Sequence, residues 1–150
     1  MARVSLLDVN VLVALFDPDH VHHDLAHDWF ADHVQDGWAT CPVTENGFVR
    51  VVSHPRFLAT PLRSAVALDQ LRKFCASGHH HFWADSVSLR DAALFDLSAA
   101  GGHRQITDVY LLGLATSMKG RLATFDRTIP LAAVKGAKTD HFAVIAAATS

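Results

Sequence analysis

The stretch that decides the fold is VSLLD at residues 4–8, a short apolar run that ends in an acid. Residues 4–7 are too few for a helix and are bounded by polar side chains, so they read as a buried strand. Asp8 then stands at the carboxyl end of that strand. The same pattern returns at residues 122–125, LATF, which Asp126 follows directly. Two strands of one buried sheet, each ending in an aspartate, are therefore expected.

Short apolar runs alternate with helical patterns along the rest of the chain. Because each parallel crossover requires a helix-sized connection, this alternation predicts an α/β fold. We expect three layers, α/β/α, around a central parallel sheet of four to five strands. Further strands are expected at residues 38–41, 82–84 and 142–148. Helices are expected at residues 21–34, 45–52, 62–75 and 108–119. Another helix is expected after a capping pair formed by Ser88 and Asp91, and a short one at residues 131–134.

Four acids stand apart from those on helix surfaces and in turns. Asp8 and Asp126 directly follow apolar strands, while Glu45 and Asp108 begin helices beside the capping residues Thr44 and Thr107. In such a sheet the carboxyl ends of the strands and the helix starts that follow share one edge. The four carboxylates are expected to converge there, although the helix dipole alone favours an acid in a first helical turn.

Converging carboxylates need a cation between them. Two of them about 4 Å apart repel by roughly 4 kcal/mol at an effective dielectric constant of 20. An all-oxygen donor set suits Mg²⁺ or Mn²⁺ better than zinc or copper. Such ions can activate water and offset the charge that builds on a phosphodiester under attack. The acids thus indicate hydrolysis of phosphate esters.

Four segments of the chain resemble the acidic blocks of the PIN-domain family, and more closely VapC-type toxins of bacterial toxin–antitoxin pairs. They are LLDVNVLVALFDPDHVHH at residues 6–23, TENGFVRV at 44–51, TDVYLLGLA at 107–115 and LATFDR at 122–127. The resemblance implies an endoribonuclease dependent on Mg²⁺ or Mn²⁺ that cleaves a structured cellular RNA. It also implies a homodimer that a cognate VapB-type antitoxin silences.

The resemblance assigns roles to individual residues. Asp8, Glu45, Asp108 and Asp126 would form the metal site, with Asp8 and Asp108 as the direct ligands and the other two acting partly through water. Polar residues beside these acids would support them. These supporting residues are Asn10, Thr107, Thr124 and Arg127.

Composition fits a single domain spanning residues 1–150, since half of the residues are apolar and can bury a sizeable core. The two cysteines, Cys41 and Cys75, lie far apart in sequence and form no CxxC pair, so neither a disulfide framework nor a zinc knuckle is expected. No run approaches the roughly 18 apolar residues of a membrane span, and no signal peptide precedes the first strand. We therefore expect a cytoplasmic protein without a membrane partner.

The net charge of −2 is low for a protein that binds RNA, because nucleic-acid-binding domains are usually basic. With four acids assigned to one metal site, however, the thirteen Lys and Arg outnumber the remaining eleven acids by two. Contacts to RNA would then come from dispersed arginines. The candidates are Arg50, Arg56, Arg104, Arg121 and Arg127.

Two other functions remain open at this point. A phosphatase could form a phospho-aspartate at Asp8, although such enzymes usually carry an acid two residues later, where this chain has Asn10. A non-catalytic module could use the acidic pocket to receive basic residues of a partner. The pair His23 and His27 and the tract at residues 79–81 are interpreted as structural, because neither forms a complete ligand set.

Overall fold

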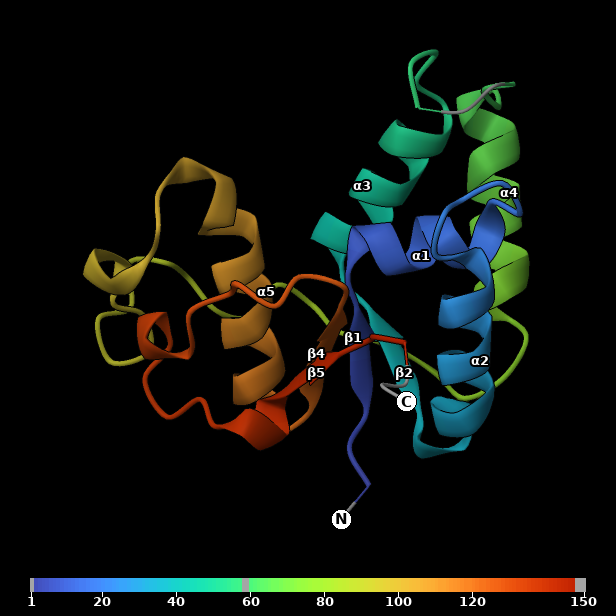
Figure 1. Cartoon of the computed structure of the whole chain (residues 1–150). Coiled ribbons are helices and arrows are strands. Elements are labelled where there is room, and N and C mark those ends of the chain that lie inside the picture. The colour runs from blue at the N-terminus through green and yellow to red at the C-terminus, as the bar shows by residue number, and fades with distance from the viewer. Residues whose placement is uncertain (1, 58–59, 148–150) are drawn as a thin grey trace.

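Five parallel strands form the centre of the computed structural model, which describes residues 2–57 and 60–147. Their order in the sheet is β3-β2-β1-β4-β5, and β1 runs from the N-terminus into α1 (Figure 1). Leu6 of β1 lies opposite Ala39 of β2 and Leu122 of β4. The strands are β1 (Ser5–Leu7), β2 (Trp38–Thr40), β3 (His80–Phe82), β4 (Arg121–Thr124) and β5 (Phe142–Val144).

Helices cover both faces of this sheet, which confirms the predicted three-layer α/β/α fold (Figure 1). Successive strand residues point to opposite faces. Leu6 and Leu122 therefore pack with α5, whereas Leu7 and Ala123 pack with α1 to α4. The helices are α1 (Val9–Phe16), α2 (His23–His33), α3 (Pro42–Val52), α4 (Ser64–Cys75) and α5 (Ile106–Ser117). Short 3-10 turns span Val34–Asp36, Leu97–Ala99, His103–Gln105, Leu131–Ala133 and Thr139–His141.

The strand ends and helix starts meet at the carboxyl edge of the sheet. Asp8 is the last residue before α1, and its side chain accepts a hydrogen bond from the backbone N–H of Val9. Asp108 lies in the first turn of α5. The loop after β4 brings Asp126 to the same edge, because β4 is the hydrogen-bonded neighbour of β1. The fold thus places three of the four predicted acids side by side.

Several local predictions were wrong. Helix α1 was not predicted, because its sequence VNVLVALF is apolar on nearly every side and shows no helical stripe. Helix α3 begins at Pro42, with Cys41 rather than Thr44 at its N-cap. The backbone N–H of Cys41 instead donates to the hydroxyl of Thr44. Proline suits the first helical position, because its missing N–H has no partner there in any helix.

Three further boundaries differ from the prediction. Residues 88–95 form turns instead of a helix, because Ser88 and Asp91 accept bonds from backbone N–H groups two residues ahead. Strand β3 begins at His80, two residues before the predicted strand. Helix α4 begins at Ser64, after the predicted Thr60 cap. Within the described residues, no helix is long and apolar enough to cross a membrane.

Candidate active site

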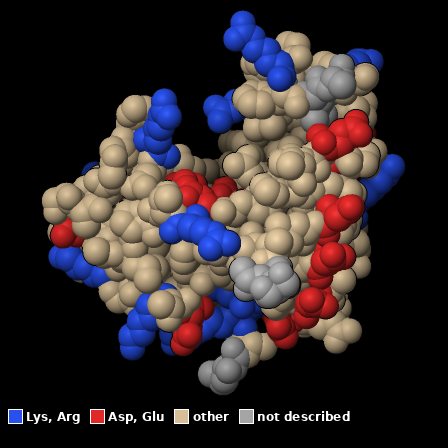
Figure 2. All heavy atoms as spheres, in the orientation of Figure 1, with Lys and Arg blue, Asp and Glu red and all other residues tan. Residues whose placement is uncertain are grey.

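An open pocket of about 470 Å³ lies at the carboxyl edge of the sheet. Figure 2 shows acidic atoms at the floor of a hollow between α5 and the helices α1 and α3, with Lys and Arg side chains on either side. Six of the predicted site residues line this pocket together with five others. The lining residues are Asp8, Val9, Asn10, Val43, Gly47, Arg50, Thr107, Asp108, Thr124, Phe125 and Asp126.

Asp8 is the most buried of the acids, with 8% of its surface exposed. Its Oδ1 accepts a hydrogen bond of 2.7 Å from the N–H of Val9, and its Oδ2 accepts one of 2.8 Å from the hydroxyl of Thr124. Burial raises the pKa of this carboxyl, and the charge of Asp126 adds to the rise, although both hydrogen bonds oppose it. Asp8 is thus held in one orientation by the first residue of α1 and the last residue of β4.

Asp108 has a strongly raised pKa, for which burial is the largest cause. Its side chain is half-buried in the first turn of α5. Burial, followed by the negative charges of Asp8 and Asp126, raises the pKa of Asp108 to about 7. The negative charges of Asp8 and Asp126 therefore act on Asp108 across the pocket that all three residues line.

Thr124 connects the other two aspartates through its hydroxyl group. The hydroxyl donates to Asp8 and accepts a bond of 3.1 Å from the backbone N–H of Asp126. Asp126 Oδ1 in turn accepts bonds of 2.7 and 2.6 Å from the backbone N–H and the hydroxyl of Thr128. The loop after β4 is thereby fixed with one oxygen of Asp126 still free of these contacts.

The three aspartates have no positive partner in the part of the chain that the structure describes. Arg72 and Asp69 form the single ion pair there, on the exposed face of α4. Arg50 lines the pocket with an exposed side chain but bonds to none of the acids. A partly buried, all-oxygen donor set with uncompensated negative charge fits a hard divalent cation such as Mg²⁺ or Mn²⁺.

The supporting residues divide into two groups. Asn10 and Thr107 line the pocket with exposed side chains, and Thr124 is buried in direct contact with Asp8. Arg127 is exposed and lies outside the lining set. Its neighbour Phe125 lines the pocket instead, and sequence reasoning had not assigned it to the site.

Gly47 is another pocket residue that sequence reasoning missed. A Cβ atom at this position would lie 2.6 Å from Cγ2 of Val9, so only glycine lets α3 approach the start of α1 this closely. A glycine inside a predicted amphipathic helix was the available signal, because it usually marks a close packing contact.

Glu45 does not line the pocket with the three aspartates. Its Oε2 accepts a hydrogen bond of 2.6 Å from the buried hydroxyl of Thr40, on the side of α3 that faces α4 and β3. There it lies beside Cys75 and His80, with one potential ligand atom of each residue within 4.8 Å of the other two. The structure therefore brings together three of the four predicted acids and separates the fourth.

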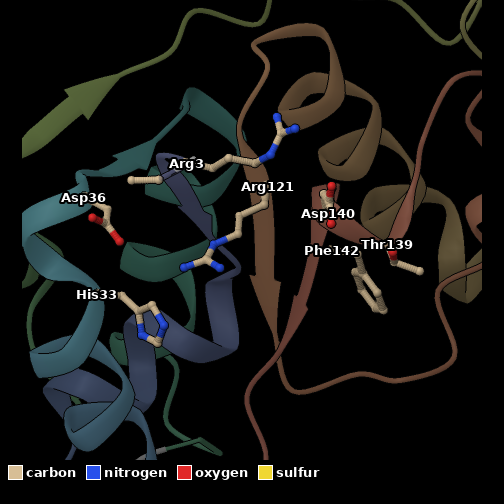
Figure 3. Close-up of a pocket in the computed structure, with 8 residues that line it drawn as sticks. Arg3, His33, Asp36, Arg121, Thr139, Asp140 and Phe142 are labelled. Atoms are coloured by element: carbon tan, nitrogen blue, oxygen red, sulfur yellow. The ribbon is translucent and has the colours of Figure 1, made fainter.

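A second pocket, of about 420 Å³, lies at the opposite edge of the sheet, where Arg3 precedes β1 and Arg121 begins β4 (Figure 3). Arg3 and Arg121 line it together with Asp36 and Asp140, so its charges are balanced. Arg121 donates from Nε to the hydroxyl of Ser5, and its guanidinium lies 5.5 Å from the ring centre of Trp29. These contacts give Arg121 a structural role.

Comparison with known proteins identifies the family of the chain. Residues 5–135 match the PIN domain. In Mycobacterium tuberculosis (strain ATCC 25618 / H37Rv), Ribonuclease VapC44 is 45% identical over 141 residues, covering 94% of this chain and 99% of that protein. Ribonuclease VapC38 is 44% identical over 136 residues (91% and 94%), and Ribonuclease VapC39 is 42% identical over 132 residues (88% and 95%). The chain therefore belongs to the PIN-domain family and, within it, to the VapC-type proteins.

Proposed function

We propose that this protein is a single-domain endoribonuclease that depends on Mg²⁺ or Mn²⁺ and acts as the toxin of a type II toxin–antitoxin pair. The observation that carries the proposal is that Asp8, Asp108 and Asp126 line one open pocket and form no ion pair with any residue that the structure describes. The relatives named as ribonucleases support the reaction class. A structured cellular RNA is the proposed substrate.

The side chains divide the work at this site. Asp8 and Asp108 would hold the cation directly, and Asp126 would hold it partly through water. Thr124 keeps Asp8 oriented through its 2.8 Å hydrogen bond, while Asn10 and Thr107 line the rim. When bound, the cation would supply an activated water and offset the charge that develops on the scissile phosphate.

Glu45 and Arg127 do not line the pocket that holds the three aspartates. The carboxylate of Glu45 is held by Thr40, away from the three aspartates. Arg127 was predicted to be the arginine beside the acids, but Arg50 of α3 lines the pocket instead. Its guanidinium would bind a phosphate of the RNA next to the one that is cleaved.

The proposed partners follow from the same pocket. A VapB-type antitoxin would silence the enzyme by placing a positive side chain among the aspartates, which satisfies their charge and excludes the cation. A homodimer and a cytoplasmic location are proposed on the family resemblance. Co-expression with an antitoxin encoded beside the toxin, followed by a cleavage assay of the purified complex, tests the silencing.

An RNA cleavage assay with purified protein tests the proposed activity. Cleavage of folded cellular RNA should require Mg²⁺ or Mn²⁺, stop with EDTA, and fall at least a hundredfold in Asp8→Asn. Asp32→Asn on the exposed face of α2 is the matched control and should cleave normally. Hydrolysis of p-nitrophenyl phosphate without RNA cleavage would identify a phosphatase and contradict the proposal.

Metal binding is measured separately by thermal unfolding of the EDTA-treated protein. A cation at a hundred times its Kd stabilises the folded state by about 2.7 kcal/mol. Wild type and Asp32→Asn should show this gain with Mn²⁺, whereas Asp8→Asn should show less. Equal gains in all three proteins would refute the assignment of Asp8 as a ligand.

A further inference from the structure

Glu45, Cys75 and His80 form a cluster on the other side of α3 from the acidic pocket. They come from the first turn of α3, the last residue of α4 and the first residue of β3. One potential ligand atom of each lies within 4.8 Å of the other two. We propose that these three side chains form a second metal site, specific for Zn²⁺ or a similarly soft divalent cation.

The donor set separates this site from the acidic pocket. A thiolate, an imidazole and a carboxylate suit zinc, whereas the three aspartates offer oxygen atoms alone and suit magnesium or manganese. Tetrahedral zinc places neighbouring sulfur and nitrogen ligands about 3.5 Å apart, given bonds of roughly 2.3 and 2.0 Å. Shifts of about 1 Å in half-buried side chains would close the present cluster to that size. Water would complete the coordination.

Thr40 holds two of the three ligands in place before any ion binds. Its hydroxyl is fully buried, donates to Glu45 Oε2 at 2.6 Å and lies 2.8 Å from Nε2 of His80. Hydrogen bonds from a second layer of residues orient metal ligands and raise affinity. A small buried hydroxyl between a carboxylate and an imidazole is such an arrangement.

The connection between Cys75 and His80 is also rigid. Four residues separate them, and both Gly78 and His79 adopt positive φ angles, of 117° and 63°. The indole N–H of Trp38 donates to the carbonyl oxygen of Gly78 at 3.0 Å, and its ring lies 4.6 Å from that of His80. The turn therefore fixes the backbone of His80 relative to the end of α4.

A role for Cys75 as a reactive thiol does not fit this environment. Burial, followed by the negative charge of Glu45, raises the pKa of Cys75 to about 11. A nucleophilic or redox-active cysteine needs a lowered pKa and a positive neighbour. Coordination of a cation is the chemistry that a thiol, a carboxylate and an imidazole can share here.

The proposal does not depend on the ribonuclease activity, and cobalt binding to the chelator-treated protein tests it. Co²⁺ should produce a thiolate-to-cobalt charge-transfer band that Zn²⁺ removes and Mg²⁺ does not. Cys75→Ser should abolish the band, and His80→Gln should weaken binding at least tenfold. The matched controls Cys41→Ser and His81→Gln should keep both.

The double variant Asp8→Asn/Asp108→Asn separates the two sites, because it should lose manganese binding and keep the cobalt band. Thermal unfolding without metal verifies that each variant is folded. A folded wild type without the band at saturating Co²⁺ would overturn the proposal. An unchanged band in Cys75→Ser would also overturn it. So would the absence of the band in a folded Asp8→Asn/Asp108→Asn variant.

Discussion

Replacing Asp108 with asparagine should stabilise the metal-free protein, although it removes a proposed ligand. The carboxyl group of Asp108 has a pKa of about 7 in the folded protein, against 3.8 for an ordinary aspartate. Burial and the charges of Asp8 and Asp126 therefore oppose its ionisation. Asparagine has nearly the same shape and carries no charge, so it relieves that opposition.

The size of the effect follows from the change in pKa. A rise from 3.8 to about 7 corresponds to about 4 kcal/mol of folding free energy, at 1.36 kcal/mol for each pKa unit. Because the side chain is half-buried and solvent screens part of the repulsion, we expect about 2 kcal/mol. In a protein of this length, that gain raises the Tm by roughly 4–8 °C.

The pH dependence identifies the cause. Below pH 3.8 the carboxyl is protonated in both states, so the substitution should change stability little. Between pH 4 and 7 the folded state keeps a proton that the unfolded state has lost, and wild-type stability falls as pH rises. The advantage of Asp108→Asn should therefore grow over this range and level off above pH 7.

Urea unfolding in EDTA at pH 5 and pH 8 measures this difference. Asp32→Asn on α2 serves as the control, because it removes the same charge from an exposed position. A gain in Asp108→Asn that is equal at the two pH values would refute the reasoning, as would a loss of stability at pH 8. Either result would mean that burial and the charges of Asp8 and Asp126 do not oppose the ionisation of Asp108 in the folded protein.

Three further substitutions test other contacts. Gly113→Ala should lower the unfolding free energy by about 2 kcal/mol in urea, because the added Cβ would clash with the ring of Phe95. Thr124→Val should weaken Mn²⁺ binding by about tenfold in calorimetry, because it removes the hydroxyl that orients Asp8; unchanged affinity would contradict that role. Arg50→Ala should raise the KM for RNA and leave Mn²⁺ affinity unchanged.

The central sheet could be predicted because its strands have strong sequence signals. β1 and β4 are short apolar runs that end in acids, and β2 is cut off by Pro42. The predicted position of β3 was two residues too late, because β3 is an edge strand with exposed side chains and no apolar run marks it. Helix α1 was missed for the opposite reason, since five of its eight residues are buried and its polar face is nearly absent.

The site was predictable as far as the backbone determines it. Strand ends and helix starts place Asp8, Asp108 and Asp126 at one edge, whichever rotamers they adopt. Glu45 differs, because its backbone lies near that edge while its side chain turns toward Thr40. That orientation depends on the buried hydroxyl of Thr40, five residues earlier, and on His80, which is distant in sequence, so no local pattern indicates it.

The pairing of β1 with β4 has a consequence for the order of synthesis. Asp8 leaves the ribosome early, whereas its hydrogen-bond partner Thr124 follows 116 residues later. Until β4 has emerged from the exit tunnel, the growing chain contains Asp8 but lacks Thr124 and Asp126 on the other side of the pocket. A chain that stops short of Thr124 would therefore carry Asp8 without the hydroxyl that orients it, so the pocket can form only after most of the polypeptide has been synthesised.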